Sequence, residues 1–235
     1  MVIPTQSGGT EFIRKSLMPL GWALGGELDG RDGTVGWCTA CEGDAKAWKF
    51  AKTWMKKGGG LGKLSTRFKW IVHQTREPVA QIRSNLAWCD ISDLNEYNMW
   101  EFVWDYIEHL SPGIPYRDPD SGEWESCLYR SMLYYLSWHR YLESVADFRI
   151  QVETENAAVE LCKVLLENLP ADDIPPTVRA LGCQPKRVGK VDRHSHGGQK
   201  KVLTWDDLYR ENEDVAAEIA VLAQRYGYDV PERQQ

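Results

Sequence analysis

Residues 68–84 combine an apolar run, an arginine and a helix start in an order that suits anion binding. Residues 70–72 are typical of a short buried strand, and Pro78 is well placed as the first residue of a helix that continues through Ser84. Open α/β sheets bind ligands at the carboxyl ends of their strands, where Arg76 is expected to lie. We therefore expect Arg76 and Ser84 to bridge a bound anion. A capped helix start without a ligand is the alternative.

A glycine-rich turn lies near the start of the chain, between a short predicted strand and a predicted helix. It consists of Thr5, Gln6, Ser7, Gly8, Gly9 and Thr10. Such a turn lets backbone N–H groups approach an oxyanion, and the N-terminus of the following helix adds its partial positive charge. The pattern predicts a phosphate-binding turn, with an ordinary strand-to-helix turn as the alternative.

Together the two motifs resemble the donor site of the sulfotransferases that use 3′-phosphoadenosine 5′-phosphosulfate (PAPS). Residues 7–10 are similar to the family's loop around the 5′-phosphosulfate, and Arg76 with Ser84 is similar to its 3′-phosphate site. The resemblance implies PAPS as donor, adenosine 3′,5′-bisphosphate as product, and no metal. It also implies a basic loop over the 3′-phosphate, for which Arg193 and His194 are the matching residues.

The resemblance also supplies a candidate general base, Glu27, which ends the strand predicted over residues 21–27. In family members that act on sugar-type acceptors, a Glu at this place takes the acceptor's proton. A carboxyl group buried beside an anion has a raised pKa, which suits it to this role. A solvated loop carboxylate is the alternative. The chain departs from the family at Gln6, where a Lys or Arg usually stabilises charge on the bridging oxygen.

The composition fits one folded domain. With 235 residues, 43% of them hydrophobic, the chain can bury one sizeable core, and we expect a single domain over residues 1–235. A net charge of −6 argues against a broad surface for nucleic acid or anionic membrane. The sequence has neither an apolar run long enough for a membrane span nor a secretory signal, so a cytoplasmic protein is expected. The oligomeric state is left open.

The periodicity of apolar residues predicts strands and helices along most of the chain. Strands are expected at residues 2–4, 21–27, 70–72 and 148–152, and helices at 44–57, 88–110, 123–146, 157–169 and 215–226. The family resemblance implies an α/β, three-layer P-loop-like fold with a central, mostly parallel sheet flanked by helices. His139, on the helix 123–146, is expected to pack in the core.

Other functions stay open. Cys38 and Cys41 have the spacing of a redox or zinc half-site, but no second pair completes it, so buried or incidental thiols are the alternative. A P-loop small-molecule kinase would need a Lys that residues 8–10 do not supply. A nucleotide-binding protein of the same fold without turnover fits the neutral Gln6. The expected reaction is in-line sulfuryl transfer to a hydroxyl or amine of a small-molecule or glycan-type acceptor.

Overall fold

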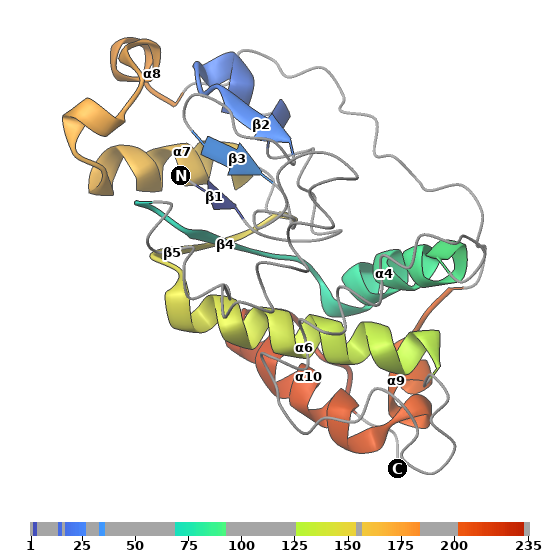
Figure 1. The fold of residues 1–235 in the computed structure, drawn as a ribbon. Helices are drawn as coiled ribbons and strands as arrows, with labels where there is room; N and C mark the ends of the chain where they lie inside the picture. Colours follow the sequence, from blue (N-terminus) through green and yellow to red (C-terminus); the bar gives the residue numbers. More distant parts are fainter. Residues whose placement is uncertain are drawn as a thin grey trace, which may run out of the picture. The chain divides into compact units, whose positions relative to one another are not determined.

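The computed structural model contains both helices and parallel strands, which is compatible with the predicted α/β class (Figure 1). The structure describes residues 2–3, 14–15, 17–26, 33–35, 69–92, 126–153, 157–183 and 202–232. The chain divides into two compact units. The first comprises Met1–Arg76 and Val145–His194, and the second comprises Glu77–Ser144 and Ser195–Gln235.

The first unit contains two parallel sheets. In one, β3 (Gly33–Val35) lies between β1 (Val2–Ile3) and β2 (Leu24–Gly26). In the other, β4 (Val72–Thr75) pairs with β5 (Phe148–Gln151). β1 also lies beside β4, and the arrows of these two strands point the same way in Figure 1. The strands therefore follow the spatial order β2, β3, β1, β4, β5, with neighbouring carboxyl ends at one edge.

Pairing with β5 fixes the position of β4. The register runs from Val72 opposite Phe148 to Thr75 opposite Gln151, and all four β4 residues are buried. The strand predicted at residues 70–72 is therefore displaced toward the carboxyl end. Ile71, the residue before β4, is held by a side chain: its N–H donates to the Asp147 carboxylate at 2.8 Å.

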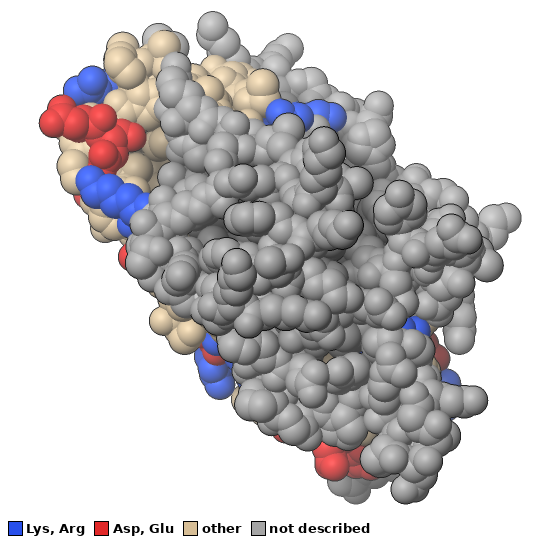
Figure 2. All heavy atoms as spheres, in the orientation of Figure 1, with Lys and Arg blue, Asp and Glu red and all other residues tan. Residues whose placement is uncertain are grey.

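In the part of the first unit that the structure describes, one longer helix and three short helical segments accompany the sheets. α7 (Ala157–Asn168) packs against β5, while η1 (Met18–Leu20) contacts α8 (Pro176–Leu181), and η3 (Ala171–Asp173) precedes α8. The shared core includes Leu17, Trp22, Leu24, Val72, Ile150, Leu161, Leu165 and Val178. Acidic and basic side chains lie next to each other around η3 and α8 (Figure 2).

A disulfide between Cys162 and Cys183 joins α7 to the residue that follows Gly182 at the end of α8. Cys162 is fully buried in the core of the first unit. The sequence spacing alone did not indicate this pairing.

Among the described residues, the second unit contains four helices. These are α4 (Pro78–Ser92), α6 (Cys127–Val145, whose last residue belongs to the first unit), α9 (Trp205–Glu211) and α10 (Glu213–Arg225). α9 begins with a capping box between Thr204 and Asp207, as expected for a Thr three residues before an acid. The shared core includes Ile82, Met132, Tyr135, Leu136, Leu208, Ile219, Ala223 and Tyr226.

Several predicted helices are confirmed, with ends that differ by a few residues. The helix predicted at 123–146 is α6, that at 157–169 is α7, and that at 215–226 is α10. Within the described part of the chain, no helix has the length and apolar character needed to cross a membrane. The helix predicted at 44–57 lies outside the described residues.

Candidate anion-binding site

Arg76 is the first residue after β4, as the sequence predicted. The backbone pairing continues at this end, because the Val152 N–H donates to the Thr75 carbonyl at 3.0 Å. The Arg76 Nε lies 4.0 Å from Glu153 Oε1, and the two side chains are 30% and 40% exposed. The carboxyl ends of β4 and β5 therefore bring one guanidinium and one carboxylate together, within reach of solvent.

The start of α4 already has its own anionic partner. Pro78 is its first residue, as predicted, and Glu77 precedes it. The Glu77 carboxylate accepts hydrogen bonds from the N–H groups of Val79 at 3.1 Å and Ala80 at 2.6 Å. Such a carboxylate satisfies first-turn donors and stabilises the helix dipole. Glu77 therefore occupies the helix end, and Arg76 is the better candidate for holding a ligand's phosphate.

Ser84 lies within α4 and is partly buried. Arg76 belongs to the first unit, and Ser84 to the second. The strand, turn and helix predicted around them are confirmed along the chain. Binding of one phosphate by both Arg76 and Ser84 stays a prediction.

The other predicted site residues lie outside the described residues. The residues concerned are Gln6, Ser7, Gly8, Gly9, Thr10, Glu27, Arg193 and His194, and the same holds for Cys38 and Cys41. The structure does describe β1, which precedes residues 6–10, and β2, which precedes Glu27. β1 ends at Ile3 and β2 ends at Gly26, and both of these residues pair with Val35 of β3. The two strands therefore end at the same level on one edge of the sheet.

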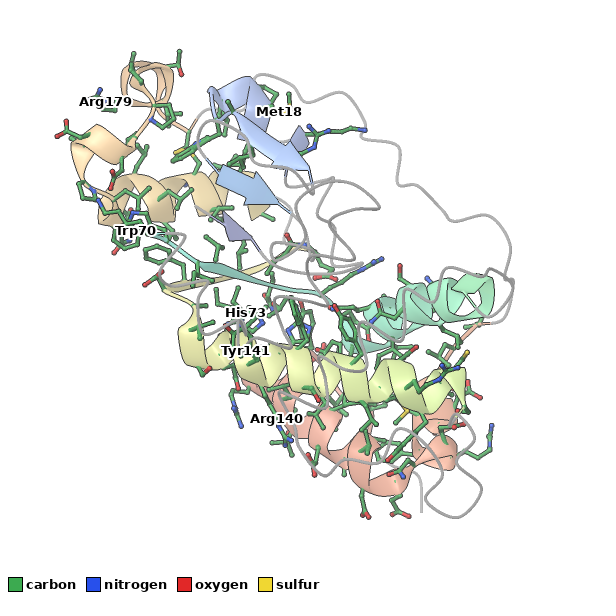
Figure 3. All side chains as sticks on the ribbon, viewed as in Figure 1. Met18, Trp70, His73, Arg140, Tyr141 and Arg179 are labelled. Carbon is green, nitrogen blue, oxygen red and sulfur yellow. A yellow bond between two sulfur atoms is a disulfide. The ribbon has the colours of Figure 1, made fainter. Side chains whose placement is uncertain are left out.

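His73 is a buried titratable side chain on β4 (labelled in Figure 3). It lies opposite Arg149 in the pairing with β5. Burial, and to a smaller extent the charge of Arg149, lower the pKa of His73 to about 3. The imidazole is therefore neutral at physiological pH, and its role in the strand is structural.

This burial predicts a loss of stability in mild acid. Because the pKa is about 3 in the folded protein and about 6.5 unfolded, only the unfolded chain binds this proton between those values. The stabilisation that comes from keeping His73 neutral in the folded protein is complete above pH 6.5 and falls as the pH decreases toward 3. The contribution of His73 to the free energy of unfolding should drop by about 2 kcal/mol between pH 7 and pH 5. Urea denaturation at the two pH values measures it.

His73→Gln is the matched variant for this measurement, since it keeps a polar side chain but does not titrate. Its pH dependence should be shallower than that of the wild type by the same amount, whatever its absolute stability. Identical slopes for the two proteins would show that His73 is not the group responsible.

A second polar cluster lies inside the second unit and includes His139. The prediction that His139 packs in the core is confirmed, since it is fully buried. Its Nε2 lies 3.2 Å from Gln81 Oε1, and its ring centroid is 4.3 Å from that of Tyr135. The Tyr226 hydroxyl donates to the His139 carbonyl at 3.5 Å. These contacts give His139 a structural role between α4, α6 and α10.

The described side chains do not point to a metal. Among the residues that the structure places, no group of three His, Cys, Asp or Glu side chains is arranged to hold a metal ion. Glu153, which follows the strand predicted at residues 148–152, was not predicted as a site residue. Its position after a strand parallel to β4 was the available signal, because parallel strands end at one edge.

No protein-family model, curated protein or solved structure matches this chain.

Proposed function

We propose that this protein is a PAPS-dependent sulfotransferase with a three-layer, P-loop-like fold. The observation that carries the proposal is the order of its parallel strands. The chain leaves β1 toward β2 on one side and leaves β4 toward β5 on the other. In open α/β sheets, ligands bind outside the carboxyl ends of the strands where the connections diverge in this way.

Both predicted phosphate-binding segments follow strands at this point of divergence. The glycine-rich turn over residues 5–10 follows β1 in sequence, and Arg76 follows β4 directly. β1 and β4 are neighbours, so a ligand with phosphate groups at two positions matches the two segments better than a ligand with one. This supports a donor that carries a 5′-phosphosulfate and a 3′-phosphate.

The proposed reaction requires no metal. Backbone N–H groups of residues 7–10, together with Arg76, Arg193 and His194, hold the donor's negative charge. The acceptor oxygen or nitrogen attacks sulfur in line, the bond from sulfur to the bridging phosphate oxygen breaks, and adenosine 3′,5′-bisphosphate leaves. Glu27 receives the acceptor's proton.

The strand geometry supports this role for Glu27. The last residues of β1 and β2 both pair with Val35, so the two strand ends are separated by one strand, a distance of about 10 Å. Glu27 is the next residue after β2. A donor held by the turn after β1 and a base after β2 leave space for an acceptor group between them. The acceptor belongs to the small-molecule or glycan class.

Calorimetry with adenosine 3′,5′-bisphosphate and with AMP tests this function. The bisphosphate should bind at least tenfold more tightly, because charge-assisted hydrogen bonds to its 3′-phosphate are absent with AMP. Equal affinities for the two nucleotides would remove the basis of the proposal. Tight binding of Mg²⁺–ATP in preference to the bisphosphate would favour the P-loop kinase.

Gln6 favours a second candidate, a nucleotide-binding protein of the same fold without turnover. The neutral amide gives no cationic stabilisation to the bridging oxygen in the transition state. Incubation with radiolabelled PAPS and a panel of hydroxyl and amine acceptors separates the two. Labelled product identifies an enzyme, whereas bisphosphate binding without any transfer identifies the binding protein.

A further inference from the structure

Glu153 and Arg76 form an ion pair at the proposed 3′-phosphate site. Their closest atoms, Arg76 Nε and Glu153 Oε1, are 4.0 Å apart. Both residues follow parallel strands whose register is fixed from Val72 opposite Phe148 to Thr75 opposite Gln151. The Val152 N–H bond to the Thr75 carbonyl extends this pairing to the residues beside the ion pair. The backbone therefore holds the carboxylate next to the guanidinium.

The Arg76–Glu153 ion pair is weak in comparison with a contact between Arg76 and a phosphate. A separation of 4.0 Å exceeds hydrogen-bond length, and side chains 30% and 40% exposed remain partly solvated. Pairs of this kind stabilise proteins little. A phosphate that forms short, bidentate hydrogen bonds to the same guanidinium binds more strongly. An incoming phosphate can therefore replace the carboxylate.

We propose that Glu153 is the resident counter-ion of Arg76 and that the 3′-phosphate of the donor displaces it. This inference rests on the proposed sulfotransferase function and adds to it a residue that sets donor and product affinity. Without bound nucleotide, Glu153 keeps the guanidinium paired. When the bisphosphate product leaves, the carboxylate returns to Arg76, so Glu153 weakens product binding and favours release.

Glu153→Gln tests the displacement, because it removes the negative charge and keeps the size of the side chain. The variant should bind adenosine 3′,5′-bisphosphate roughly three- to tenfold more tightly than the wild type, since competition and like-charge repulsion are both lost. AMP, which lacks the 3′-phosphate, should bind both proteins equally. The gain should shrink in 1 M salt, which screens charges beyond about 3 Å.

Glu167→Gln is the control for net charge. Glu167 is an exposed acid in α7, in the same unit, and its neutralisation should leave bisphosphate affinity unchanged. The gain from Glu153→Gln should be smaller when Arg76 is already Ala, because competition for the guanidinium is then absent and only like-charge repulsion remains.

The outcomes separate this inference from the proposed function. If the wild type prefers the bisphosphate over AMP but Glu153→Gln binds it equally or more weakly, Glu153 is not a competing counter-ion, and the proposed function stands. An equal gain in Glu167→Gln, or in the Arg76→Ala background, would likewise overturn the inference. If the wild type does not prefer the bisphosphate, the proposed function fails and this inference fails with it.

Discussion

Arg76→Ala is expected to weaken the binding of adenosine 3′,5′-bisphosphate by roughly thirtyfold, or about 2 kcal/mol. Truncating one partner of a charged hydrogen-bonded pair typically costs 2 to 5 kcal/mol, mainly because the other charge is left without a partner. Arg76 is 30% exposed and has Glu153 beside it, so the lower end of that range applies. Isothermal calorimetry at low salt measures the change directly.

Arg179→Ala is a suitable control for this experiment. Arg179 lies on α8 in the same unit (labelled in Figure 3), and its loss changes the net charge by the same amount. Its bisphosphate affinity should match that of the wild type, and AMP should bind all three proteins equally. If Arg76→Ala instead keeps full affinity for the bisphosphate, Arg76 does not bind the 3′-phosphate, and its role is limited to the ion pair with Glu153.

Loss of the Cys162–Cys183 disulfide is expected to lower the free energy of unfolding by about 3 kcal/mol. The bond closes a loop between residues 21 positions apart. Closing a loop of this length lowers the conformational entropy of the unfolded chain, which stabilises the folded state by about 3 kcal/mol. Urea denaturation of Cys162→Ala, Cys183→Ala and the double variant measures it. Because either change breaks the bond, the three variants should be destabilised by similar amounts.

Substitution is a cleaner test than chemical reduction, because Cys127 is also disulfide-bonded and a reductant would not act on the Cys162–Cys183 bond alone. Small effects of the single variants that add up in the double variant would contradict a stabilising bond. Disulfides persist chiefly in oxidising compartments, so the bond weighs against the cytoplasmic location that the sequence analysis predicted.

Local signals were sufficient to predict the segment from β4 to α4. Pro78 has a fixed φ and no N–H to satisfy, which is why it could be identified as the first helical residue. Phe148 to Gln151 alternate in side-chain direction and form β5 almost as predicted. The position of Arg76 between a strand and a helix followed from these two elements, without knowledge of any long-range contact.

Features that depend on residues far apart in the chain could not be predicted in this way. β3 has only three residues, Gly33 to Val35, and exists through its pairing with β1 and β2 on either side. The partner of Glu153 could not be predicted from its residue type. It lies next to Arg76 because of the register between β4 and β5. The disulfide depends likewise on how α7 and α8 pack in one core.

The pairing of β4 with β5 also determines when the first unit can fold during synthesis. Ile71 and Asp147, which are hydrogen-bonded beside these strands, are 76 positions apart, and the whole first segment of the second unit, Glu77–Ser144, lies between them. At about 5 to 20 residues per second, β4 waits roughly 4 to 15 s for β5 to be made. During that interval its buried residues, Val72 to Thr75, have no partner strand from β5. A nascent chain that pauses before residue 148 would therefore present β4 to chaperones, and the order of synthesis places completion of the anion-binding site after α6.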